Sequence, residues 1–316
     1  MRIIDFTISH IEQAEQIAKQ NYEKEREFVP ALPDVDAIPD LAAFAQNGLG
    51  VAAFEDDDML GFLCAVGPFE NAFQSTNAVG VFSPMGANGA DHENRAEVYA
   101  RMYQAAGEKW ASAGASSHAI CLYAHDLETQ DQFFRYGFGL RCIDAIREMD
   151  EITAFSPEKY SFNRVASENS SMVMHLDNML DQSYIDSPFF MYRTGHSESE
   201  WFEYWEESNP VCFAAYREGK AVAFILAELE GETFIKDTTG YQHITGLYCL
   251  PEHRGRGVSQ KLLDMLILNL KADGHTHLGV DYESFNPSGS GFWHKYFTAY
   301  THSVVRRIDE HVLSKR

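Results

Sequence analysis

Residues 244–263 read ITGLYCLPEHRGRGVSQKLL, and this stretch decides the fold. Its apolar start predicts a β-strand over Ile244–Leu250 that stops at Pro251. A basic, glycine-rich loop follows, and a helix with leucines at helical spacing begins at about Val258. The start of a helix presents unpaired N–H groups and the positive end of the helix dipole. Strand, loop and helix together predict an anion-binding cradle, and a diphosphate is its natural ligand.

The loop residues suit that ligand. Gly255 and Gly257 carry no Cβ, so the backbone can come close to a phosphate. Arg254 and Arg256 add positive charge to the same loop. The alternative is a glycine-rich turn in which the two arginines are incidental.

The chain contains the same series of elements twice. Val51–Val66 and Phe213–Glu228 both predict a β-hairpin, and their starts are 162 positions apart. Each hairpin is followed by an amphipathic helix with a stop glycine, an apolar strand and a short aromatic helix. In the first copy these are Asn94–Ala113, Ala119–Ala124 and the run from Phe133. In the second copy they are Val258–Asp273, Leu278–Tyr282 and the run from Phe292. We therefore predict two copies of one α/β domain with a mixed sheet, residues 1–150 and 151–316. Two unrelated α/β domains are the alternative.

The second copy resembles the GNAT family of acyl-CoA N-acyltransferases. The family signature [Q/R]-x-x-G-x-[G/A] stands here as Arg254-x-x-Gly257-x-Ser259, with serine in the last place. A second family element, an asparagine followed seven residues later by an aromatic, stands as Asn286 and Trp293, where the family usually has tyrosine. The resemblance implies two splayed strands that hold pantetheine between them. It implies a coenzyme A site formed by Leu247, Tyr248, Cys249, Arg254, Gly255, Arg256, Gly257, Val258, Ser259, Asn286 and Trp293.

The activity implied by the resemblance is direct transfer of an acetyl group from acetyl-CoA to a primary amine of a small acceptor, without a metal. An alkylammonium must lose a proton first, which costs about 4.6 kcal/mol at pH 7 for a pKa of about 10.4. The family often has a glutamate on the strand before the loop, and Thr245 and Gly246 stand there instead. The candidate bases are Glu228 and His243, with Asp281 and Glu283 as alternatives. Trp293 cannot protonate the leaving thiolate, so the candidate acid is Tyr296, with Tyr282 as a further option.

The first copy looks degenerate. Its counterpart of the strand and loop, Val79–Gly89, keeps a proline and glycines but has no arginine or glutamine. Asp91 and Glu93 follow, and their charges would repel a pyrophosphate. We therefore expect residues 1–150 to bind no coenzyme A and to shape or complete the acceptor site.

Composition narrows the functional class. The 316 residues hold 25 Lys and Arg against 47 Asp and Glu, a net charge of -22. This argues against partners such as nucleic acid or an anionic membrane surface, which need clustered basic residues, and slightly favours a cationic acceptor. The five cysteines form no C-x-x-C pair, which indicates a reducing compartment and no structural zinc. With no visible signal peptide, we expect a cytoplasmic protein. The sequence leaves a homodimer open.

Two other functional hypotheses are alternatives to an acetyltransferase. A non-catalytic acyl-CoA-binding or regulatory protein would explain the missing glutamate and the missing tyrosine. A purely structural protein is less compatible with the intact residues 254–257. The aromatic cluster Trp201, Phe202, Tyr204 and Trp205 is expected on a helix, where it either lines an acceptor pocket or packs in the core.

Overall fold

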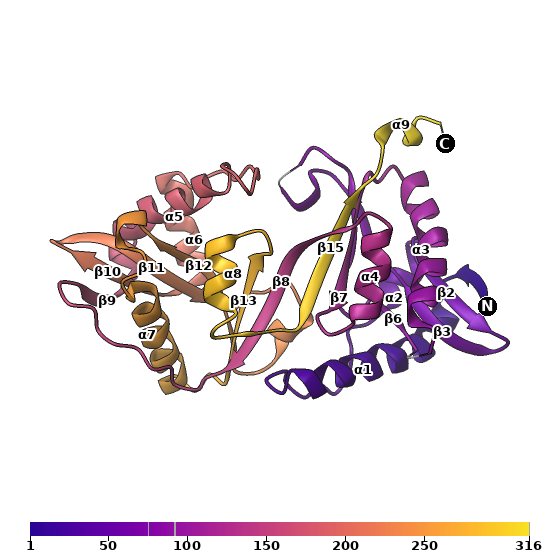
Figure 1. Cartoon of the computed structure of the whole chain (residues 1–316), viewed down its shortest axis with the longest axis horizontal. Helices are drawn as coiled ribbons and strands as arrows, with labels where there is room; N and C mark the ends of the chain where they lie inside the picture. Colours follow the sequence, from indigo (N-terminus) through magenta and orange to yellow (C-terminus); the bar gives the residue numbers. More distant parts are fainter. Residues whose placement is uncertain (75, 92, 316) are drawn as a thin grey trace. The chain divides into compact units, whose positions relative to one another are not determined.

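The computed structural model describes residues 1–74, 76–91 and 93–315, which form two compact units (Figure 1). The first unit comprises Met1–Asp144 and Ala299–Arg316, and the second comprises Ala145–Thr298. These bounds differ from the predicted domains, 1–150 and 151–316, mainly in the assignment of residues 299–316. The C-terminal segment joins the first unit because strand β15 (Thr301–Arg307) pairs along its full length with β7 (Ser117–Tyr123).

The first unit contains a four-stranded sheet in the order β1-β2-β3-β6 and a further set of paired strands in the order β4-β5-β7-β15-β8. Besides β7 and β15, its strands are β1 (Arg2–Asp5), β2 (Val51–Glu55), β3 (Asp58–Leu63), β4 (Val66–Phe69), β5 (Gly80–Ser83), β6 (Asn88–Ala90) and β8 (Gly139–Glu148), which continues into the second unit. Its helices are α1 (Ile11–Phe28), α2 (Ala42–Gln46), α3 (Arg95–Ser112), α4 (Leu127–Arg135) and α9 (Glu310–Leu313).

The second unit is built on strands in the order β13-β12-β11-β10-β9. These strands are β9 (Ser161–Val165), β10 (Val211–Arg217), β11 (Lys220–Glu228), β12 (Tyr241–Cys249) and β13 (His277–Glu283). The short β14 (Thr298–Ala299) lies outside this order. Its helices are α5 (Ser171–Ser183), α6 (Glu198–Ser208), α7 (Val258–Ala272) and α8 (Pro287–Trp293). Among the described residues of the chain, no helix has both the length and the apolar composition needed to cross a bilayer.

The predicted hairpins and the main helices are confirmed. β2 pairs antiparallel with β3, and β10 pairs antiparallel with β11, around the turns expected from the sequence. The two-residue turn of the second hairpin is Glu218-Gly219, and both residues have positive φ, which suits the right-handed twist of paired strands. Helices α3 and α7 start within one residue of their predicted starts, Asn94 and Val258.

The core of the second unit explains the apolar spacing of its helices. The leucines at 262, 263, 266 and 270 of α7 are all fully buried, and α7 packs on β10 and β11. Helix α5 contacts β11 and β12 and lies on the other side of the sheet (Figure 1). Trp201 and Trp205 of α6 are buried in a cluster with Val173 and Leu176 of α5. The core interpretation of the aromatic cluster is therefore correct for these two tryptophans.

The predicted strand and loop of the first copy differ from the observed elements. The sequence treated Pro84–Gly89 as the counterpart of the cradle loop. Instead, Asn88–Ala90 form strand β6, which pairs antiparallel with β3. The strand that corresponds to β12 is thus divided into β5 and β6, and the residue directly before α3 is Asn94. The error arose because proline and glycines mark an interruption of a strand as readily as a loop before a helix.

Candidate functional site

The strand, loop and helix that predicted an anion cradle are present in the second unit. After β12, a 3₁₀ turn covers Pro251–His253 and α7 begins at Val258. Gly255 and Gly257 have φ values of 70° and 79°, in the left-handed region that favours glycine. A Cβ on Gly255 would meet no described atom within 4 Å, so there is open space beside the loop. Gly257 is the N-cap of α7 and makes no side-chain cap, which leaves the first N–H groups of the helix for an anion.

The two arginines of the loop have different positions. Arg254 lines the pocket described below, and its Nε donates a hydrogen bond of 2.9 Å to the carbonyl oxygen of Cys249. Its guanidinium also lies 5.5 Å from the centre of the Tyr248 ring. Arg256 is not among the residues that line this pocket, and its Nε donates to the carbonyl of Glu252 at 3.2 Å. Arg254 is therefore the loop cation that is placed to meet a bound anion.

A pocket opens where the two central strands separate. β12 and β13 are parallel, and their paired register ends at Ile244 and Val280. Beyond that pair lies a pocket of about 720 Å³. Most of the predicted coenzyme A residues line it: Leu247, Tyr248, Cys249, Arg254, Gly255, Gly257, Val258, Ser259, Asn286 and Trp293. Residues predicted from separate motifs thus meet around one cavity, and the strand separation is the one that the family resemblance implied.

Asn286 and Trp293 belong to α8. The side chain of Asn286 caps this helix by accepting a hydrogen bond of 2.8 Å from the N–H of Gly289. Gly289 packs closely against the cap, because a Cβ there would lie 2.5 Å from Asn286 Nδ2. Trp293 is 6% exposed and fills the position at which the family usually has a tyrosine. An indole offers an N–H but no acidic hydroxyl, so the acid must come from another residue.

A chain of three polar side chains lies at the inner end of the pocket. Nε2 of His243 is 2.9 Å from Oδ1 of Asp281, and its Nδ1 is 2.7 Å from the hydroxyl of Tyr241. His243 is only 2% exposed and does not line the pocket, whereas Asp281 does and its side chain is 35% exposed. Gly279 makes room for this chain, since a Cβ there would lie 1.9 Å from the Tyr241 hydroxyl. Asp281 is therefore the member that can touch a substrate.

The charge of Asp281 follows from its neighbours. Burial raises the pKa of this carboxyl, but the hydrogen bond and the charge of His243 outweigh that effect and leave the pKa below its usual value. Asp281 is thus ionised at neutral pH. It is the one carboxylate among the residues that line the described pocket, where the positive side chains are Arg254 and Lys295.

The other candidate bases lie outside the pocket lining. Glu228 is 6% exposed, and its Oε1 accepts hydrogen bonds from Tyr204 at 2.7 Å and from Thr245 at 2.8 Å. Thr245 does line the pocket, so Glu228 is one residue removed from it. Glu283 is 7% exposed and is also absent from the lining.

Both candidate acids line the pocket. Burial raises the pKa of Tyr296, so its hydroxyl keeps its proton at neutral pH. The hydroxyl of Tyr282 lies 3.1 Å from Nδ1 of His294. Tyr282 and Tyr296 are therefore both within the pocket lining, where a phenol hydroxyl could reach a bound ligand.

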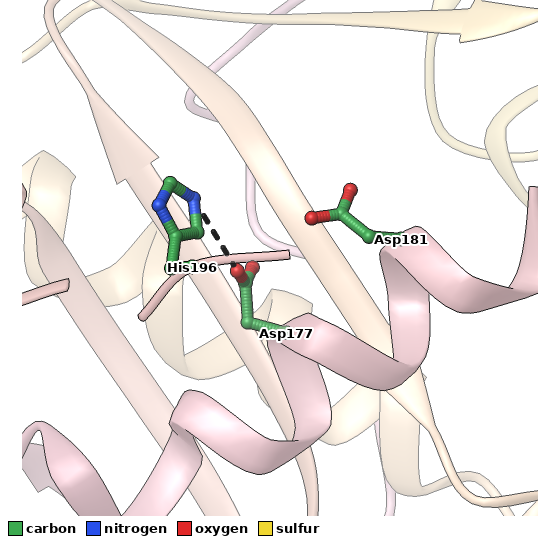
Figure 2. Close-up of side chains that lie close together, drawn as sticks. All are labelled: Asp177, Asp181 and His196. Carbon is green, nitrogen blue, oxygen red and sulfur yellow. Dashed lines mark ion pairs between the residues drawn. The ribbon is translucent and has the colours of Figure 1, made fainter. Parts of the chain in front are cut away.

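A pair of carboxylates lies on α5 outside the pocket lining (Figure 2). Asp177 and Asp181 are one turn apart, and together with His196 they place three polar atoms within 4.8 Å of one another. Burial, followed by the charge of Asp181, raises the pKa of Asp177 to about 6. Asn178 holds the His196 backbone through two hydrogen bonds, of 2.7 and 3.1 Å. The fold therefore holds the carboxylates of Asp177 and Asp181 close together, with His196 as the neighbouring group that could balance their charge.

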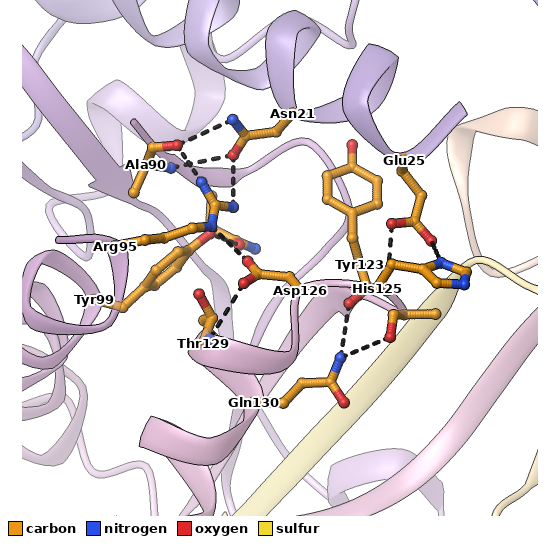
Figure 3. Close-up of polar contacts among 12 residues, drawn as sticks. Asn21, Glu25, Ala90, Arg95, Tyr99, Tyr123, His125, Asp126, Thr129 and Gln130 are labelled. Atoms are coloured by element: carbon orange, nitrogen blue, oxygen red, sulfur yellow. Dashed lines mark hydrogen bonds and ion pairs between the residues drawn. The ribbon is translucent and has the colours of Figure 1, made fainter. Parts of the chain in front are cut away.

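The corresponding part of the first unit is filled by its own side chains (Figure 3). Arg95, the first residue of α3, is 8% exposed. Its Nε lies 2.6 Å from Asp126 Oδ2, its Nη2 donates to Asn21 at 2.8 Å, and its Nη1 donates to the carbonyl of Ala90. Asp126 caps α4 as Asn286 caps α8. In the first unit, an internal ion pair thus joins the first residue of α3 to the cap of α4.

Sequence reasoning missed part of the pocket wall. Phe155, Tyr184 and Phe189 line the pocket, although they lie outside every motif identified in the sequence. Residues 184–192 read YIDSPFFMY, an aromatic run in a connecting segment that could have been noted. Phe155 left no such signal, because it is a single aromatic in the segment between β8 and β9.

Comparison with known proteins agrees with this geometry. The model of the acetyltransferase (GNAT) family matches residues 178–297. Among curated proteins, no sequence matches the chain. The crystal structure of a GCN5-related N-acetyltransferase from Sphaerobacter thermophilus is similar over 96% of this chain and 95% of its own, with 10% identity and a TM-score of 0.59.

Two further structures are similar. A GCN5-related glucosamine N-acetyltransferase region of a fungal multi-domain GH3 β-N-acetylglucosaminidase aligns with 96% of this chain and 38% of its own, with 10% identity and a TM-score of 0.52. A tandem GNAT protein from the clavulanic acid biosynthesis pathway aligns with 97% and 98%, with 11% identity and a TM-score of 0.48. At these identities, the two likenesses with TM-scores above 0.5 show a common fold.

Proposed function

Because residues 178–297 form a domain of the GNAT acetyltransferase family, we propose that this chain transfers an acetyl group from acetyl-CoA to the primary amine of a small acceptor. One observation carries the proposal. A single pocket of about 720 Å³ is lined both by the anion cradle and by the separated strands β12 and β13. A diphosphate at the cradle would let the rest of an extended donor run along β12 toward Asp281.

The residues present fit coenzyme A. The open space beside Gly255 and the uncapped start of α7 accommodate a diphosphate, and Arg254 supplies a positive charge. The backbone of Leu247, Tyr248 and Cys249 lies beyond the last paired residues of β12 and β13, where it can hydrogen-bond to the pantetheine amides and polarise a carbonyl. Acetyl-CoA supplies the activated acetyl group. Val258 and Ser259 complete the cradle at the first turn of α7.

The acceptor amine would be bound and deprotonated at Asp281. An ionised carboxylate attracts an ammonium group and can accept the proton that this group must lose before the nitrogen lone pair attacks the thioester carbonyl. His243 does not line the pocket, so its role is to hold Asp281 in place, with Tyr241 holding His243 in turn. Glu228 does not line the pocket and would reach the acceptor only through Thr245, which donates a hydrogen bond to it. Tyr296 is the proposed donor of a proton to the departing thiolate, with Tyr282 as the alternative.

The test is turnover of acetyl-CoA with a panel of polyamines, amino acids and amino sugars. Glucosamine is included because a structurally similar protein region acetylates it. We expect Asp281→Asn to lower kcat by about 10²–10⁴-fold, the usual contribution of a positioned base, and Glu228→Gln to lower it far less. His243→Ala should shift the pH profile of kcat rather than remove activity. Equal activity in wild type and Asp281→Asn would contradict the assignment of the base.

A second outcome would favour the non-catalytic alternative. The missing strand glutamate and the tryptophan at position 293 are the features that motivate it. Wild-type protein that binds acetyl-CoA but acetylates no amine of the panel would support an acyl-CoA-binding protein instead of a transferase.

A further inference from the structure

Phe155 is an exposed aromatic ring at the rim of the cradle. It lies between β8 and β9, is 62% exposed, and lines the pocket together with Gly257 and Gln260. A phenylalanine this exposed gains little from the hydrophobic core of its own unit. What distinguishes Phe155 from other exposed phenylalanines such as Phe190 is its position in the lining of the pocket, beside the anion-binding loop.

The ring is held against the start of α7. A Cβ on Gly257 would lie 2.7 Å from Cζ and 3.0 Å from Cε1 of Phe155, so the ring edge rests on the glycine. Two residues earlier, the carbonyl of Thr153 accepts a hydrogen bond of 2.7 Å from Gln260 Nε2. The segment that carries Phe155 is thus tied to the helix whose N-terminus forms the cradle.

The direction of the pocket determines which part of a donor reaches this ring. The acceptor end is marked by Asp281, near the last paired residues of β12 and β13. From there β12 runs on through Cys249 to the cradle, and Phe155 lies beyond it, against Gly257. With the diphosphate at the cradle and the thioester toward Asp281, the nucleoside of coenzyme A would leave the pocket on the side of Phe155.

We propose that Phe155 stacks on the adenine ring of the donor, so that the site selects acyl groups carried on free coenzyme A over acyl groups carried on phosphopantetheine alone. This inference rests on the proposed function. An aromatic side chain at the edge of a phosphate site provides a flat apolar surface for a base, and its removal commonly weakens binding by about tenfold.

The experiment measures dissociation constants by calorimetry for acetyl-CoA and for S-acetyl-4′-phosphopantetheine, which lacks the 3′-phosphoadenosine and one of the two phosphates of the diphosphate. The variants are Phe155→Ala, Phe155→Trp to keep an aromatic face, and Phe202→Ala as a control. Phe202 is an exposed phenylalanine of α6 that does not line the pocket.

We expect Phe155→Ala to bind acetyl-CoA about tenfold more weakly and to bind the phosphopantetheine thioester as wild type does. Phe155→Trp should restore acetyl-CoA binding, and Phe202→Ala should change neither constant. Equal weakening of both ligands would overturn the inference, because the ring would then act only by supporting the cradle. No weakening of either would overturn it as well, while the proposed function would stand. Wild-type protein that binds neither ligand would overturn the proposed function and the inference together.

Discussion

The two units differ at the start of their long helices, α3 and α7. In the second unit, α7 begins at an uncapped glycine beside a pocket, and Arg254 lines that pocket. In the first unit, α3 begins with Arg95, whose guanidinium is buried and bonded to Asp126, Asn21 and the carbonyl of Ala90 (Figure 3). One arginine is placed to meet a ligand, and the other completes the fold.

This comparison distinguishes the elements that both units share from the residues that are found only beside the pocket of the second unit. Both units keep the hairpin, the long helix, the following strand and a short capped helix. Directly before the long helix, the second unit has left-handed Gly257 and the first has Asn94, and the second has a neutral asparagine at the next cap. In the first, that cap is Asp126, whose charge is neutralised by Arg95. Among the described residues, no arginine forms such a buried pair with Asp177 or Asp181 of the second unit, and burial raises the pKa of both.

The largest expected effect follows from breaking the internal pair. Arg95→Ala leaves Asp126 buried without its partner, and loss of one member of a buried pair costs about 3–5 kcal/mol of stability. Urea denaturation followed by circular dichroism measures it. Arg101→Ala on the same helix is the control, because Arg101 makes only an exposed 3.8 Å pair with Glu97 and should cost less than about 0.5 kcal/mol. Acetyl-CoA binding to folded Arg95→Ala should be unchanged. If Arg95→Ala and Arg101→Ala were equally stable, the buried pair of Arg95 with Asp126 would not stabilise the first unit, contrary to the role given to Arg95 here.

A smaller effect is expected where charges are left incompletely paired. The folded pKa of Asp177, about 6, exceeds its unfolded value, so the folded state keeps the proton longer and stability falls as pH rises through this range. Asp177→Asn should therefore stabilise the protein by about 2 kcal/mol at pH 8, and by much less near pH 4. The midpoint of urea unfolding at the two pH values measures this. A variant less stable than wild type at pH 8 would show that His196 neutralises the pair.

The smallest effect concerns a feature that the two units share. Gly114 after α3 and Gly274 after α7 have φ of 90° and 89°, and a Cβ at either would meet no described atom within 4 Å. Alanine at each position should cost about 1 kcal/mol, from backbone strain alone. Thermal unfolding of both variants tests this, and neither should lose acetyl-CoA binding. A much larger loss in only one of them would show that the two helix ends are not equivalent.

Local patterns predicted the local elements and the cradle. The hairpins, α7 and the loop at 254–257 depend on neighbours within a few residues, and sequence spacing reports those. Asp281 and His243 were both candidates, but their order in the site was open. The register of β12 with β13 decides it, because it puts His243 opposite Gly279 and lets Asp281 reach the pocket.

Pairing between strands that are far apart in the sequence could not be predicted from local patterns. Nothing local to residues 301–307 shows that this strand pairs with β7 in the first unit. An arginine at the start of a helix is usually expected to be solvated, so no residue near Arg95 in the sequence indicates that its side chain is buried. Phe155 reaches the cradle through a contact with Gly257, about a hundred positions away in the sequence.

Calorimetric titration of acetyl-CoA into the whole chain tests the central claim most directly. We predict that one molecule binds per chain and that none binds to Arg254→Glu, in which the cradle cation becomes an anion. Thermal unfolding gives a second reading, since ligand at about 100 times Kd should stabilise wild type by about 2.7 kcal/mol and leave the variant unchanged. Two molecules per chain, or undiminished binding to Arg254→Glu, would contradict the contrast between the units.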